Sequence, residues 1–102
     1  MRRKFCFLSV LICILLAATP ALAKPITIKF SHVVAVDTPK GQAAEYFKKL
    51  VEERSKGEIR VEVYPNASLH DDRDAIEAIS MNAIQMAAPS FSKFTSFVPQ
   101  LQ

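Results

Sequence analysis

Cysteine is almost absent from this chain: the only two, Cys6 and Cys13, both lie within its first 23 residues. The remainder therefore contains no disulfide and no cysteine nucleophile, and its stability has to come from a hydrophobic core. Glycine is equally scarce, with 2 residues in the chain, and no glycine-rich loop for phosphate binding is present. A Ser/His/Asp constellation is also missing, so the sequence offers no catalytic motif.

An excess of one charge is missing too, once the N-terminal segment is set aside. The chain has 13 Lys+Arg against 10 Asp+Glu, a net charge of +3. Arg2, Arg3 and Lys4 supply the whole of this excess, so residues 24–102 carry equal numbers of acidic and basic side chains. A neutral chain of this kind gives no support for binding nucleic acid or another polyanion.

The first 23 residues have the three parts of a secretory signal peptide. Basic residues at positions 2–4 precede an apolar run over residues 5–18, and Ala21-Leu22-Ala23 provides the small residues that signal peptidase requires. The apolar run is shorter than the ~20 residues that span a bilayer, which argues against a membrane anchor. We expect cleavage after Ala23 and, because the rest of the chain lacks disulfides, export to a bacterial periplasm.

Hydrophobic periodicity predicts five alternating elements. Alternating apolar side chains predict strands at residues 25–31 and 58–65, and the apolar run at residues 83–90 is typical of a buried strand. Between them, apolar residues three or four apart predict a helix from Thr38-Pro39 to a left-handed cap at Gly57, and another over residues 72–82. The order β-α-β-α-β implies an α/β fold with a parallel sheet and right-handed crossovers.

Three loops leave the carboxyl ends of the predicted strands, over residues 31–40, 66–73 and 89–93. In a parallel sheet these ends meet at one edge, and folds of this class bind ligands outside that edge. The sequence therefore predicts a binding site formed by these three loops.

The segment IKFSHVVAVDTPKGQAAEYFKKLVEERSKGEIRVEVYPNASL, followed by DDRDAIEAI and QMAAPS, resembles the N-terminal part of the solute-binding proteins of tripartite ATP-independent periplasmic (TRAP) transporters. This family includes the C4-dicarboxylate receptors. The resemblance covers nearly all of residues 26–97 and implies a type II periplasmic-binding-protein-like fold, in which two α/β domains enclose the ligand. Two departures are His70 and Asn82, where the family usually has glycine. Asparagine tolerates the left-handed conformation that glycine adopts.

The resemblance also implies that part of the binding site lies outside this chain. Family members are much longer, and the arginine that pairs with the ligand carboxylate lies beyond residue 102. The aromatic and apolar tail SFSKFTSFVPQLQ also differs from a usual domain end. We expect residues 1–23 to be a signal peptide and residues 24–102 to be an incomplete first solute-binding domain; a natural truncation remains an alternative.

Three candidate ligand-binding residues lie at the exit of the first strand, by resemblance. Lys40 is expected at the rim of the cleft, where an ammonium beside a helix N-terminus can pair with a carboxylate. The alternative is an ordinary solvated lysine. His32 and Val33 end the first strand, where the family presents side chains or amides to the ligand. For His32, a structural role is the competing interpretation.

Three further candidates follow the other two strands. The hydroxyl of Ser90 can donate to a carboxylate or cap the next turn. Lys93 matches a position where relatives carry a basic residue toward the cleft, with simple exposure as the alternative. Arg73 either contacts the ligand or ties its loop together through Asp71 or Asp72, and we favour the second role.

The acidic turn around residues 70–74 is a weak candidate for a metal site. His70, Asp71, Asp72 and Asp74 lie close in sequence, but the glycine and terminal glutamate of a calcium loop are missing. Capping of the next helix explains the aspartates more simply. We therefore predict neither a metal nor a cofactor.

Our first hypothesis is a periplasmic receptor without enzymatic activity. It would capture a small organic anion by charge-assisted hydrogen bonds in a closing cleft. Its partners, as the resemblance implies, would be this organic acid and, transiently, the integral membrane subunits of a TRAP-type secondary transporter. One alternative is a secreted α/β enzyme whose catalytic part is missing from this chain. Another is a truncated product that has lost this function or has an unrelated interaction role.

Overall fold

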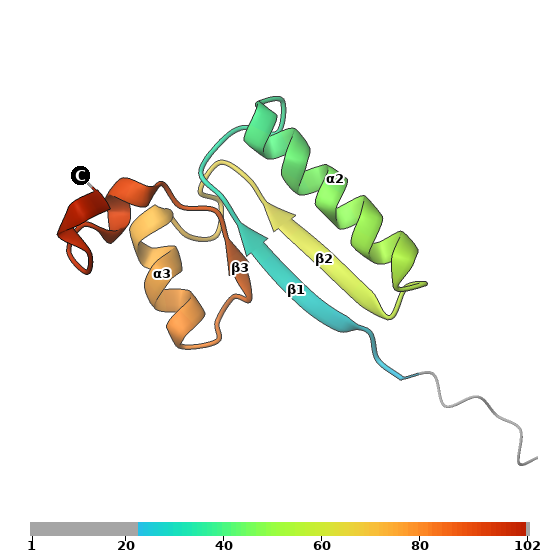
Figure 1. The fold of residues 1–102 in the computed structure, drawn as a ribbon. Coiled ribbons are helices and arrows are strands. Elements are labelled where there is room, and N and C mark those ends of the chain that lie inside the picture. Colours follow the sequence, from blue (N-terminus) through green and yellow to red (C-terminus); the bar gives the residue numbers. More distant parts are fainter. Residues whose placement is uncertain (1–22, 102) are drawn as a thin grey trace, which may run out of the picture.

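A three-stranded parallel sheet with strand order β2-β1-β3 is the centre of the fold (Figure 1). The computed structural model describes residues 23–101. The elements are β1 (Ile26–Ser31), α2 (Pro39–Arg54), β2 (Ile59–Tyr64), α3 (Asp72–Ser80) and β3 (Met86–Ala87), followed by the 3-10 helices η1 (Phe91–Phe94) and η2 (Pro99–Leu101). The predicted β-α-β-α-β order and the parallel sheet are thus confirmed.

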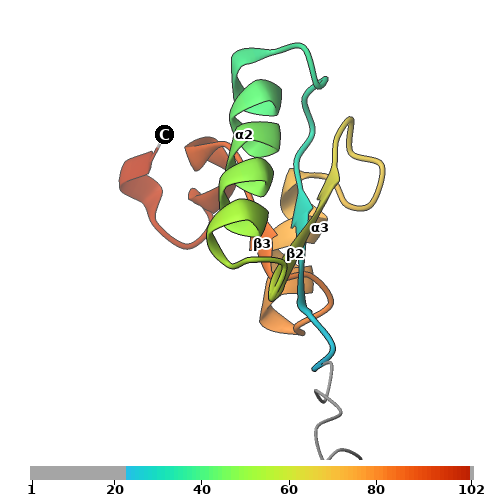
Figure 2. The same cartoon turned by 90° about the vertical axis from the view of Figure 1, so that its right-hand side faces the viewer.

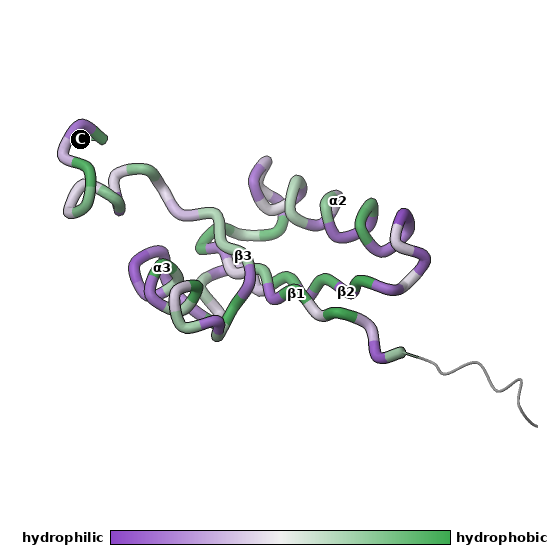
Figure 3. Tube along the Cα trace, turned by 60° about the horizontal axis from the view of Figure 1, so that its bottom comes forward, coloured by the Kyte–Doolittle hydropathy of each residue, from purple (hydrophilic) through white to green (hydrophobic). Residues whose placement is uncertain are grey.

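The two helices cover opposite faces of the sheet. The first crossover leads from β1 to β2, and the second leads back past β1 to β3. Because both crossovers are expected to be right-handed, a reversal of direction places the second helix on the other face. Figure 2 shows α2 along one side of β1 and β2, and Figure 3 shows α2 and α3 on opposite sides of the strands.

The larger core lies between α2 and the sheet. Phe30, Ala44 and Val61 are buried there, and Phe47 and Val51 pack against them. The rings of Phe30 and Phe47 meet edge to face, with their centroids 6.1 Å apart. These residues alternate in the strands and recur every three or four positions in the helix. The apolar side chains that the sequence patterns predicted for the strands and for the helix therefore pack against each other in this core.

A smaller core joins α3 to β3. It consists of Ala75, Ala78 and Ile84, with Ala87 packed against it. Alanines on the inner face of α3 bring the helix close to the strand, because their side chains are short.

Both helices end in a Schellman motif, with a residue in the left-handed region. At the end of α3 this residue is Asn82, with φ 57°, and the amide of Ala83 donates to the Ala78 carbonyl over 2.8 Å. The expectation that Asn82 tolerates the left-handed conformation is confirmed. At the end of α2, Gly57 has φ 82° as predicted, but Lys56 precedes it with φ 53° and occupies the first left-handed position.

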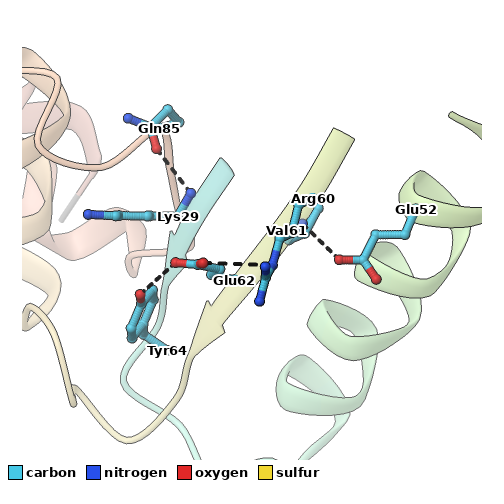
Figure 4. Close-up of polar contacts among 7 residues, drawn as sticks. All are labelled: Lys29, Glu52, Arg60, Val61, Glu62, Tyr64 and Gln85. Carbon is cyan, nitrogen blue, oxygen red and sulfur yellow. Dashed lines mark hydrogen bonds and ion pairs between the residues drawn. The ribbon is translucent and has the colours of Figure 1, made fainter. Parts of the chain in front are cut away.

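The prediction of a strand over residues 83–90 is wrong in length, because β3 covers only Met86–Ala87. The amide of Ala83 is already used by the cap of α3. Gln85 bonds to β1 through both its backbone and its side chain: its N donates to Lys29 O over 3.2 Å, and its Oε1 accepts from Lys29 N over 3.0 Å (Figure 4). Except for Ala23, the predicted signal peptide (residues 1–23) lies outside the described part. Within residues 23–101 no helix has the length and apolar character needed to span a membrane.

Candidate functional site

The loops that leave β1 and β2 are bonded to each other at the carboxyl edge of the sheet. Asn66 N donates to Val34 O, and Ala67 N donates to His32 O, each over 3.0 Å. Asn66 and Ala67 have φ 56° and 54°, in the left-handed region that non-glycine residues rarely adopt. The Ser31 hydroxyl donates to the His70 carbonyl over 3.1 Å, so the second loop is also tied to the end of β1.

The loop after β1 packs tightly on the start of α2. Thr38 caps the helix by accepting from Gly41 N, and its hydroxyl donates to Ala35 O over 2.7 Å. A Cβ at Gly41 would collide with the carbonyl oxygen of Ala35 and lie 2.7 Å from that of Val36. Glycine is therefore required at this position for the loop to approach the helix, a constraint that sequence reasoning missed.

Lys40 connects the first and third loops. Its side chain is half-buried, and its Nζ donates to the Ala88 carbonyl over 3.0 Å. No acidic side chain lies in the first turn of α2, although carboxylates stabilise the positive end of a helix. The ammonium and the helix N-terminus thus add up to a local positive field, which suits an anion. The role of Lys40 as a ligand contact stays a prediction.

His32 is buried, with 2% of its surface exposed. Its ring meets Phe30 edge to face with centroids 5.9 Å apart, and within residues 23–101 neither ring nitrogen has a hydrogen-bond partner. Buried polar groups normally have partners. His32 is not among the residues that line the groove described next, and its predicted contact with a ligand is untested.

A groove of about 330 Å³ gathers residues from all three loops. It is lined by Val33, Asp71, Asp72, Arg73 and Lys93. Three of the six predicted binding residues, Val33, Arg73 and Lys93, thus come together here. Arg73 and Lys93 also line a neighbouring hollow of about 720 Å³, between α3 and residues 92–97. The two cations bring positive charge to the point where both spaces meet.

The aspartates of this groove have separate tasks. Asp71 caps α3, since its Oδ1 accepts from Arg73 N over 2.8 Å and from Asp74 N over 2.9 Å. The hydrogen bonds from the amides of Asp74 and Arg73 lower the pKa of Asp71 below 3.8. The capping role predicted for the acidic turn is confirmed for Asp71. No cluster of three metal-ligating side chains occurs in the described part of the chain.

Asp72 holds the third loop to the start of α3. The residue is 7% exposed, and its Oδ2 accepts from Ser90 N over 3.1 Å. The predicted site residue Ser90 is thereby fixed through its backbone, while its side chain stays exposed. Sequence reasoning treated Asp72 as one of three equivalent capping residues, and no spacing in the sequence marks it as different.

Within residues 23–101 the one ion pair within 4.0 Å joins Arg60 and Glu62, so the guanidinium of Arg73 forms no ion pair with either aspartate. The Asp71 carboxylate accepts instead from the backbone amide of Arg73. The role of the Arg73 side chain, which is exposed and lines the groove, stays a prediction.

The family of the chain follows from comparison with known sequences. The profile of bacterial extracellular solute-binding protein family 7, named DctP, matches residues 30–102. The chain belongs to this family. It is 54% identical over 77 residues to a C4-dicarboxylate-binding periplasmic protein of Rhodobacter capsulatus. The match covers 76% of this chain and 23% of that protein. The chain therefore spans about a quarter of the length of the curated relatives it matches.

Solved structures of family members confirm the fold. A TRAP solute-binding protein from Pseudomonas aeruginosa with bound L-malate is 58% identical, with a TM-score of 0.72, over 76% of this chain and 27% of that one. One from Shewanella oneidensis with bound succinate is 51% identical, with a TM-score of 0.74, over 78% of this chain and 26% of that one. The described residues thus form part of a type II two-domain α/β fold, as expected.

Proposed function

We propose that this chain is part of a periplasmic receptor that captures a small organic anion, a C4-dicarboxylate or a related carboxylate, for a TRAP-type secondary transporter. The observation that carries the proposal is the identity above 50% with proteins whose structures contain malate or succinate. The groove supports it, because Arg73 and Lys93 supply charge that a carboxylate can pair with. Residues 1–23 act as the signal peptide, and residues 24–102 contribute to the first domain.

In this proposal the three loops form one wall of the ligand site. Lys40, Arg73 and Lys93 supply positive charge, Val33 supplies an apolar contact, and the Ser90 hydroxyl donates a hydrogen bond. Binding and release need no chemical step, so the protein is not an enzyme. The partners are the organic acid and, transiently, the membrane subunits of the transporter.

The test uses the protein as its source cell makes it. We would isolate the periplasmic species that begins at Lys24, determine its intact mass, and titrate it with malate and succinate by calorimetry. Saturable binding of either acid without turnover supports a receptor. Conversion of the acid would favour the alternative of a secreted enzyme, and absence of both binding and turnover would exclude the proposal for these ligands.

A further inference from the structure

Among residues 23–101, β2 lies at an edge of the sheet, and half of its backbone groups point away from β1. The amides of Ile26 in β1 and of His32, the residue after β1, donate to the carbonyls of Glu58 and Tyr64, which fixes the orientation of β2. Alternate residues of a strand direct their backbone groups to opposite sides. The backbone N–H and C=O groups of Ile59, Val61 and Val63 therefore point away from β1. Such a row of backbone groups is a template for pairing with another strand.

Two side chains from the C-terminal end of α2 occupy part of this row. Glu52 Oε1 accepts from Val61 N over 3.0 Å, and Ser55 Oγ accepts from Ile59 N over 3.0 Å. The Ser55 hydroxyl is also 3.4 Å from the Ile59 carbonyl. Figure 4 shows Glu52 reaching from the helix to the strand. We call Glu52 and Ser55 the edge cap.

The sequence of β2, IRVEVY, is complementary to itself when two copies run antiparallel. If Val61 lies opposite Val61 of a second copy, Ile59 lies opposite Val63. The outward backbone N–H and C=O groups of the two strands then form hydrogen bonds with each other. Arg60 then lies opposite Glu62 in both directions. Cross-strand pairs of opposite charge and of β-branched side chains stabilise such ladders, and the arrangement has the two-fold symmetry of common dimers.

We propose that the edge cap keeps the chain from pairing with a second copy of itself through β2. Without the cap, the outward amides of Ile59 and Val61 are free, and the favoured partner is the same strand of another molecule in the antiparallel register centred on Val61. The contact is independent of the ligand groove, which lies at the carboxyl ends of the strands.

The experiment compares the mass in solution of the purified protein and its variants over a range of concentrations. Glu52→Met with Ser55→Ala removes the acceptors of the cap and keeps the length of the side chain in a good helix former. We expect the wild type to remain a monomer and the double variant to shift toward twice that mass as its concentration rises. Glu53→Met, which changes the same charge at an exposed neighbouring position of α2, is the matched control and should stay monomeric.

Charge reversal in the Glu52→Met, Ser55→Ala double variant tests the proposed register of the two β2 strands. Arg60→Glu places like charges opposite each other and should return the protein to a monomer, and adding Glu62→Arg should restore the dimer. A folded, monomeric double variant would overturn the proposal. A dimer whose formation is not weakened by Arg60→Glu would overturn it as well. If the double variant does not fold, amide exchange in the wild type decides: the cap predicts a protected Val61 amide, and exchange at the rate of an unfolded chain would refute it.

Discussion

Replacing Asp72 by alanine tests whether a single carboxylate positions the third loop. The side chain lies at the first position of α3 and is buried, and its Oδ2 accepts from the Ser90 amide over 3.1 Å. The substitution removes this acceptor, so the Ser90 amide loses its partner. It also removes a negative charge from the helix N-terminus.

The size of the effect follows from these two losses. A hydrogen bond from an amide to a charged group contributes about 1.5–3 kcal/mol, and a carboxylate in the first helical turn contributes about 0.3–1 kcal/mol. The exposed Asp74 lies in the same turn, so Asp74→Ala loses only the second contribution. We expect Asp72→Ala to lower the free energy of unfolding by about 2 kcal/mol more than Asp74→Ala does.

Urea unfolding of the wild type and both variants measures this difference. In the same samples, the amide resonance of Ser90 should shift in Asp72→Ala and remain in place in Asp74→Ala. If the two variants are equally stable within about 0.5 kcal/mol, the buried hydrogen bond does not hold the loop and the reasoning fails.

Three further predictions concern backbone geometry, acid stability and the ligand. Gly41→Ala should lower the free energy of unfolding, measured by urea denaturation, by about 3 kcal/mol, because the new Cβ meets carbonyls of the loop after β1. An unchanged free energy of unfolding would contradict this close packing. Because folding lowers the pKa of Asp71 below 3.8, its stabilisation is complete above that pH and is lost as the pH falls further. Asp71→Asn, which keeps an acceptor, should flatten that part of the stability curve. Lys40→Ala should weaken dicarboxylate binding at least tenfold in calorimetry while exposed Lys49→Ala does not, and equal affinities would remove Lys40 from the site.

The carboxyl edge of the sheet combines rigid and open parts. Backbone hydrogen bonds, the close contact at Gly41 and the Asp72 carboxylate fix where the loops run. The side chains of Arg73 and Lys93 remain exposed beside them. A fixed backbone with available cations suits a receptor, because little has to be ordered when an anion binds.

The sequence by itself determined the order of elements and the parallel sheet, and with them which loops leave the carboxyl edge of the sheet. These features depend on local patterns: alternation in β1 and β2, a helical stripe in α2, and the preferences of Thr38, Asn82 and Gly57 for helix ends. Each pattern acts within a few residues, so it can be read without knowing what the segment packs against. The length of β3 was misjudged, because an apolar run does not reveal that Ala83 caps a helix.

Only the tertiary structure decided which residues share the site and how they are held. Asp72 meets Ser90 across 18 positions and Lys40 meets Ala88 across 48, and no local pattern records such pairs. The burial of His32 has the same origin. Side-chain partners depend on where loops distant in sequence come together. The packing of the two helices on opposite faces of the sheet determines the positions of these loops.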